Sequence, residues 1–154
     1  MSKVLVIEDD RIKIEKISSF LDFEDFIIKE SYHSGLEELN NNSHLFKYLI
    51  LDMTIPLWDR GKSDLGGTYE QFGGERILKE MRRRKKFIPT ILLSMFDVFP
   101  TTGGNLTFKE LDNNLKSQFP DFYKGAVFYN GVEEDRWKKE LKYLIDSINP
   151  SIND

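Results

Sequence analysis

Residues Lys3–Asp10 read KVLVIEDD, a short apolar run that ends in three acidic residues. The run is rich in β-branched residues and short, so it predicts a strand whose carboxyl end carries the acids. Two later runs have the same form, since Tyr48–Leu51 ends in Asp52 and Thr90–Leu93 ends in Ser94. In an open parallel sheet the carboxyl ends of the strands share one edge, where ligands bind. The pattern therefore predicts one pocket built from three distant segments.

The segments between the apolar runs have helical spacing. In the first of them, Ile14, Ile17 and Leu21 fall three and four residues apart and give one apolar helix face. The remaining predicted strands are Phe26–Ile28 and Ala126–Tyr129, and the predicted helices are Arg11–Phe23, Ser34–Asn40, Glu75–Arg84, Thr107–Ser117 and Trp137–Ile148. This alternation predicts an α/β fold, with a flavodoxin-like five-stranded parallel sheet of order 2-1-3-4-5 and helices on both faces.

The composition excludes several classes of function. The 154 residues fit a single domain over residues 1–154, with extended loops near 57–73 and 95–106. A net charge of −4 argues against nucleic-acid binding, and no apolar stretch reaches membrane-spanning length. The chain lacks cysteine, which excludes disulfides and cysteine zinc sites, and Met1–Lys3 leads into the first strand with no signal peptide. We therefore expect a cytoplasmic protein with no attached output domain.

The acids at the predicted sheet edge indicate a metal-assisted site. Glu8, Asp9 and Asp52 would repel one another in one crevice, and a divalent cation would relieve that repulsion. Mg²⁺ takes oxygen ligands and suits one or two carboxylates together with a phosphate. A carboxylate can also act as the nucleophile that forms an aspartyl-phosphate. The alternative is an ordinary strand-to-helix turn in which Asp10 caps the following helix.

Three motifs together resemble the receiver domains of bacterial two-component response regulators. They are Lys3–Asp10 (KVLVIEDD), Tyr48–Pro56 (YLILDMTIP) and Ile88–Ser94 (IPTILLS). The resemblance extends from Lys3 to about Ile148 and implies a stand-alone receiver that takes a phosphoryl group from a sensor histidine kinase or a phosphotransfer protein. It implies signalling by docking to an unknown downstream protein, and no enzymatic turnover.

The resemblance also implies roles for individual residues. Asp52 is the expected phosphoacceptor, and Ser94 is the expected switch hydroxyl. Glu8, Asp9 and Asp52 are the expected Mg²⁺ ligands, joined by the backbone carbonyl of Thr54. The aromatic partner of the switch stays open between Phe128 and Tyr129, which are neighbours at the end of the fifth strand.

The sequence departs from the receiver pattern at the end of the fifth strand, where the family carries a lysine. Counting back from the last helix places Asn130 at that position, whereas counting forward places Val132 there. Lys124 lies at the wrong end of the strand. An asparagine amide can donate a hydrogen bond but brings no charge, so we expect weaker coupling to a phosphoryl group. Arg60 and Lys62 in the first long loop are candidates to replace the cation.

Two other functions remain open from the sequence. The absent lysine and the two long loops favour a degenerate receiver, which would act as a phosphorylation-independent protein-interaction module. A Mg²⁺-dependent phosphatase that uses Asp52 is a third class, but no general base can be assigned near that residue.

Overall fold

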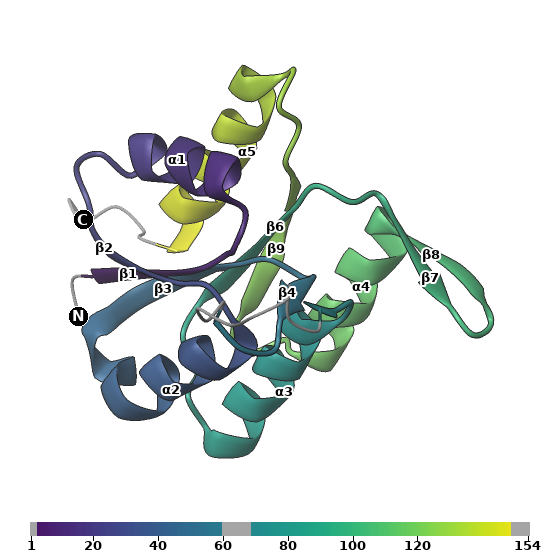
Figure 1. Cartoon of the computed structure of the whole chain (residues 1–154), viewed down its shortest axis with the longest axis horizontal. Coiled ribbons are helices and arrows are strands. Elements are labelled where there is room, and N and C mark those ends of the chain that lie inside the picture. The colour runs from purple at the N-terminus through teal and green to yellow at the C-terminus, as the bar shows by residue number, and fades with distance from the viewer. Residues whose placement is uncertain (1–2, 60–68, 149–154) are drawn as a thin grey trace.

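The core of the protein is a parallel sheet that runs through the centre of the molecule (Figure 1). The computed structural model describes residues 3–59 and 69–148. Five strands form the sheet in the order β2-β1-β3-β6-β9. Their bounds are β1 Lys3–Ile7, β2 Asp25–Lys29, β3 Phe46–Leu51, β6 Thr90–Ser94 and β9 Tyr123–Phe128. Counted among themselves, these strands follow the order 2-1-3-4-5, so the predicted fold class is confirmed.

Helices cover both faces of the sheet, as predicted. Their bounds are α1 Arg11–Phe20, α2 Tyr32–Asn42, α3 Gly73–Arg84, α4 Phe108–Gln118 and α5 Glu134–Ile148, and a short 3₁₀ helix spans Ser43–Leu45. Helices α1 and α5 pack on one face, and α2, α3 and α4 pack on the other (Figure 1). Within the described ranges, no helix combines the length and the hydropathy that crossing a membrane requires.

Strand β1 shows why the apolar runs are continuous. Val4 and Val6 point into the core beneath α1 and α5, whereas Leu5 and Ile7 point into the core beneath the other three helices. All four side chains are fully buried. Successive strand residues face opposite sides, so a strand covered on both faces needs apolar residues at every position.

Side-chain caps precede α1, α2 and α4, whereas α3 starts without one, and the cap of α2 corrects the sequence prediction. Helix α4 begins with the expected capping box, in which Thr107 and Glu110 bond to each other's backbone N–H. The prediction that Ser34 opens α2 was wrong. Ser31 is the cap and Ser34 is its partner in the box, because the hydroxyl of Ser34 can bond back to the Ser31 N–H as a glutamate usually does.

The two long loops contain more structure than the sequence predicted. The segment near 95–106 holds an antiparallel hairpin, with strands β7 Val98–Thr101 and β8 Gly104–Thr107, which projects beyond α4 (Figure 1). Pro100 and the glycines indicated a loop, but proline is tolerated in a two-stranded ribbon and Gly104 adopts a φ of 130° at the turn. In the first loop, β4 Ile55–Pro56 pairs with β5 Tyr69–Glu70. Arg60 and Lys62 lie outside the described residues.

Candidate functional site

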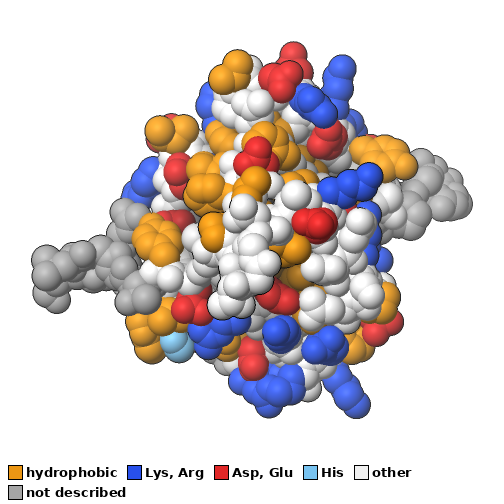
Figure 2. All heavy atoms as spheres, turned by 90° about the vertical axis from the view of Figure 1, so that its right-hand side faces the viewer, with side chains coloured by type: hydrophobic (Ala, Val, Ile, Leu, Met, Phe, Trp, Pro, Cys, Tyr) orange, Lys and Arg blue, Asp and Glu red, His pale blue; other side chains and the backbone are white. Residues whose placement is uncertain are grey.

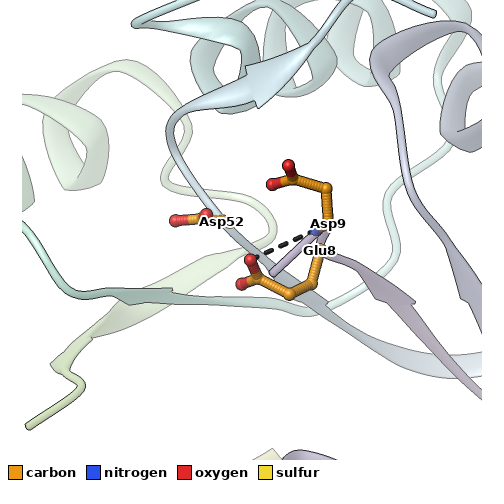
Figure 3. Close-up of side chains that lie close together, drawn as sticks. All are labelled: Glu8, Asp9 and Asp52. Atoms are coloured by element: carbon orange, nitrogen blue, oxygen red, sulfur yellow. Dashed lines mark hydrogen bonds between the residues drawn. The ribbon is translucent and has the colours of Figure 1, made fainter. Parts of the chain in front are cut away.

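Three acidic side chains meet at the carboxyl edge of the sheet. Glu8 and Asp9 follow β1, and Asp52 follows the neighbouring strand β3. One carboxylate oxygen from each lies within 4.8 Å of the others, and Figure 3 shows the three side chains gathered at the strand tips. All three residues are buried. The juxtaposition expected from the strand ends is therefore present.

Strand register places these acids at the same level. Ile7 is paired with Leu51 across β1 and β3, so the next residue of each strand leaves the sheet side by side. The Asp52 N–H still donates to the Ile7 carbonyl at 3.1 Å. Helix α3 approaches the turn after β3 closely, since a Cβ on Gly74 would lie 2.5 Å from the Asp52 carbonyl oxygen. The turn after β3 is therefore held between β1 and the start of α3.

Lys13, a residue that the sequence prediction missed, lies inside this acidic cluster. Its side chain is fully buried, and its Nζ lies 2.6 Å from Glu8 Oε1 and 3.4 Å from Asp52 Oδ1. Nζ also donates to the Leu93 carbonyl at 2.5 Å. An ammonium has three N–H donors, which matches the three acceptors, whereas a neutral amine has two. The geometry therefore favours a charged lysine in the pocket.

The electrostatics of the cluster agree with that geometry. Burial by itself lowers the pKa of Lys13, but Asp52 and Glu8 together outweigh it, so the pKa rises above its usual value. Burial raises the pKa of Glu8 to about 8 and also raises the pKa of Asp52, and Lys13 opposes both shifts. One ammonium is therefore too little positive charge to keep the buried carboxylates as acidic as they are in water.

Both carboxylate oxygens of Glu8 are bonded to neighbouring groups. Oε1 binds Lys13, and Oε2 accepts from the backbone N–H groups of Asp9 and Asp10, each at 3.2 Å. Asp10 itself caps α1 by accepting from the Lys13 N–H, as predicted. The turn between β1 and α1 thus orients Glu8, and the Asp10 cap fixes the start of the helix that carries Lys13.

The donor set fits a hard divalent cation. The converging atoms are all carboxylate oxygens, which Mg²⁺ prefers. When all three carboxylates are ionised, they and the ammonium of Lys13 leave two formal negative charges, which one divalent ion would neutralise. The hydroxyl of Tyr69, from β5, also donates to Asp9 Oδ2. Glu8, Asp9 and Asp52 would be the residues that hold the ion, and Glu8 is at the same time bound by Lys13 and by two backbone N–H groups.

The other predicted site residues lie around this edge, and their roles stay predictions. Ser94 ends β6, is fully buried, and accepts from the Phe96 N–H at 3.2 Å. The hydroxyl of Thr54, in the turn after β3, donates to the Gln71 carbonyl at 2.9 Å.

The end of β9 holds the position expected for the family's lysine. The Asn130 amide bonds to Glu133 and accepts from the Val132 N–H, so it caps the turn before α5. Tyr129 is buried, and its ring centroid lies 5.6 Å from Lys13 Nζ. Phe128 instead packs edge-on against Phe108 of α4. Tyr129 is thus the aromatic side chain that borders the acidic cluster.

One feature of the sequence could have indicated that Lys13 is buried. It lies four residues before Ile17 and eight before Leu21, so it belongs to the buried stripe of α1. Ile14, which the sequence analysis assigned to that stripe, is half-buried. A lysine at a core position of an otherwise amphipathic helix indicates an acidic partner, because a buried ammonium needs one.

Related sequences are found at modest identity. No family model matches the chain. An uncharacterized protein y4jR of Sinorhizobium fredii is 27% identical over 146 residues, which cover 91% of this chain and 94% of that protein. The Detocs response regulatory protein DtcB of Enterobacter cloacae is 24% identical over 143 residues, which cover 89% of this chain and 94% of that protein.

Solved structures of response regulators share the fold. The Mn(2+)-bound form of response regulator Rcp1 matches with a TM-score of 0.62 at 13% identity, covering 98% of this chain and 97% of that chain. The receiver domain of the Francisella response regulator 1452 matches with a TM-score of 0.59 at 18% identity, covering 96% of this chain and 98% of that chain. At these identities the likeness establishes the fold, and the resemblance seen in the sequence is confirmed at that level.

Proposed function

We propose that this chain, which has the fold of a response-regulator receiver domain, accepts a phosphoryl group on Asp52 with the help of Mg²⁺ and signals by docking to another protein. The observation that carries the proposal is the buried cluster of Glu8, Asp9 and Asp52 at the tips of β1 and β3. The protein then acts as a phosphoryl carrier in a relay, and turnover of a substrate is not part of its role.

The chemical step is in-line displacement at phosphorus. Met53 N–H and Lys13 Nζ both approach Asp52 Oδ1, which leaves Oδ2 as the attacking oxygen in this proposal. The Oδ2–P bond forms as the P–N bond of a phosphohistidine breaks. The histidine nitrogen keeps the electron pair of that bond and takes up a proton from solvent. Catalysis of such a step depends mostly on position and electrostatics.

Each acidic residue has a separate task in this scheme. Asp9 and Asp52 supply oxygens for the cation, and Glu8 fixes the ammonium of Lys13 beside the acceptor. When bound, Mg²⁺ would offset the negative charge that builds up on the transferred group. Burial of the cluster strengthens these interactions, because water screens them less. Response regulator Rcp1, which shares the fold, has been solved with Mn²⁺ bound.

The partners follow from the reaction. The donor is a sensor histidine kinase or a phosphotransfer protein, since Asp52 needs a phosphohistidine within reach. For the downstream protein, a hollow beside the site is lined by Thr54, Tyr69 and apolar residues of the hairpin segment. Phe96 and Val98 in that lining are exposed. Figure 2, which views the molecule from the hairpin side, shows hydrophobic side chains gathered in the upper half of this face.

A phosphodonor assay tests the proposal. Incubation with Mg²⁺ and acetyl phosphate should give a protein heavier by one phosphoryl group, and beryllofluoride should bind in its place. Asp52→Ala should abolish both results. Asp121→Ala is the matched control, because Asp121 is exposed and precedes β9 at the opposite edge of the sheet. An adduct that persists in Asp52→Ala, or none in the wild type at millimolar Mg²⁺, contradicts the proposal.

One observation favours a second candidate, the phosphorylation-independent interaction module. Lys13 already places positive charge between Glu8 and Asp52, so the acidic cluster is partly compensated without a metal. A folded protein that neither binds Mg²⁺ nor forms an adduct in the same assay would support this second function.

A further inference from the structure

A buried lysine on α1 contacts the acceptor aspartate directly. We propose that Lys13 is the cation that pairs with the phosphoryl group on Asp52, and that α1 thereby supplies the positive charge missing from the end of the fifth strand. This inference rests on the proposed function, because it needs a phosphoryl group on Asp52.

The position of Lys13 within its helix supports a role in the pocket. It lies in the first turn of α1, where the helix dipole disfavours a cation. Its full burial adds a desolvation cost. Contacts within α1 do not offset these two costs. The stabilising contribution must therefore come from the acidic cluster that Lys13 contacts.

The contact distances show which interaction can respond to a phosphoryl group. Nζ lies 2.6 Å from Glu8 Oε1 and 2.5 Å from the Leu93 carbonyl, but 3.4 Å from Asp52 Oδ1. The contact with the acceptor is thus the longest of the three. A phosphoryl group on Asp52 adds strongly charged oxygens beside this ammonium, and charge-assisted hydrogen bonds are among the strongest in proteins.

The end of β9 has no cation of its own that could pair with a phosphoryl group on Asp52. Residues 126–133 contain no lysine or arginine. Tyr129, at the tip of β9, has its ring 5.6 Å from Lys13 Nζ, so the ammonium lies beside the strand end that lacks a cation of its own. Asn130 is used by the turn that precedes α5.

The same ammonium connects the acceptor to β6. It holds the carbonyl of Leu93, the residue before Ser94. When Lys13 pairs with a phosphoryl group, its bond to this carbonyl competes with the new contact. The pairing would therefore act on the backbone that carries the predicted switch hydroxyl.

A substitution pair provides the first test. Lys13→Gln should slow phosphorylation of Asp52 by acetyl phosphate, or shorten the lifetime of the product, by roughly 10- to 100-fold, the effect of losing one charged hydrogen bond. Lys16→Gln is the matched control, because Lys16 belongs to the same helix and its ion pair with Glu134 is exposed. Equal rates and lifetimes in Lys13→Gln and wild type would overturn the inference.

A second measurement needs no variant that alters the pocket. In the ¹⁵N-labelled wild type, the buried Lys13 ammonium should give a slowly exchanging signal in a lysine side-chain NMR spectrum. With Mg²⁺ and beryllofluoride, this signal should shift together with the Asp52 amide signal. An Asp52 shift with an unchanged Lys13 signal overturns the inference and leaves the proposed function intact. A spectrum in which neither signal moves ends both proposals.

Discussion

Lys13 and Lys16 lie three residues apart on α1, and each holds a glutamate carboxylate at 2.6 Å. The side chains of Lys13 and Glu8 are 0% and 3% exposed, whereas those of Lys16 and Glu134 are 42% and 31% exposed. The two ion pairs have the same length and opposite surroundings. The two pairs therefore differ in burial: Lys13–Glu8 belongs to the buried acidic cluster, whereas Lys16–Glu134 lies at the surface.

The comparison shows why distance alone does not rank ion pairs. Two exposed charges are already solvated, and salt screens their attraction. Two buried charges have lost water, so each depends on the other for compensation. Removing one partner of the buried pair leaves an uncompensated charge, and removing one partner of the exposed pair leaves a hydrated side chain.

The largest expected effect comes from breaking the buried pair. Lys13→Met removes the only cation described within hydrogen-bonding range of Glu8 and Asp52 in residues 3–59 and 69–148. We expect the free energy of unfolding in metal-free buffer to fall by about 3–5 kcal/mol. Urea denaturation measures this change. A loss below about 1 kcal/mol would show that Lys13 contributes as little as a surface lysine.

The next-largest effect on stability is expected from adding a divalent metal ion. Under the proposed function, Mg²⁺ at about 100 times its Kd should stabilise the wild type by about 2.7 kcal/mol, because it would bind the folded cluster and not the unfolded chain. Asp9→Asn should lose most of that stabilisation, since Asp9 offers an oxygen to the cluster. Thermal unfolding with and without Mg²⁺ gives the result, and Lys16→Gln should respond to Mg²⁺ as the wild type does.

A change in packing should have an intermediate effect. Gly74→Ala places a Cβ 2.5 Å from the Asp52 carbonyl oxygen and 2.9 Å from the Met53 Cα, so the turn after β3 must move. We expect a loss of about 1–3 kcal/mol in unfolding free energy and slower phosphorylation. Gly103→Ala is the matched control, because no described atom beyond its two chain neighbours lies within 4 Å of a Cβ at Gly103. Equal stability of the two variants would contradict this reading of α3.

The smallest effect is expected at the exposed pair. Lys16→Gln should leave the urea midpoint unchanged within error, because Lys16 and Glu134 remain solvated without each other. The difference between Lys13→Met and wild type should persist at 1 M salt, whereas any effect of Lys16→Gln should disappear. A salt-insensitive loss in Lys16→Gln would remove the distinction between the two pairs.

Much of the fold was predictable, because strand ends and helix faces are local signals. The apolar runs ending at Ile7 and Leu51 marked strands that share one sheet, and the parallel-sheet rule then brought Glu8 and Asp52 together. The hairpin of β7 and β8 was missed because Pro100 and the glycines are equally typical of an irregular loop.

The position of Lys13 in the acidic cluster was harder to predict. Lys13 bonds to Leu93, 80 residues away in the chain, and sequence spacing carries no information about that contact. The sequence indicated the position where receivers carry their lysine, with Arg60 and Lys62 as replacements. Asn130 at that position caps a turn, and Arg60 and Lys62 lie outside the described residues. The location of the charge depends on which long side chain can reach the pocket, and this is decided only when α1 packs on the sheet.

The contacts of Lys13 also bear on the order of folding. Its ammonium is bonded to groups that follow β1 and β3 and to a carbonyl within β6, so all three strands and α1 must be assembled before it can leave water. A half-formed sheet offers too few acceptors, and the lysine stays hydrated until late. Interactions made after the rate-limiting barrier govern how fast the native state is lost. Lys13 would thus lower the rate of unfolding of the native domain and leave its rate of folding unchanged.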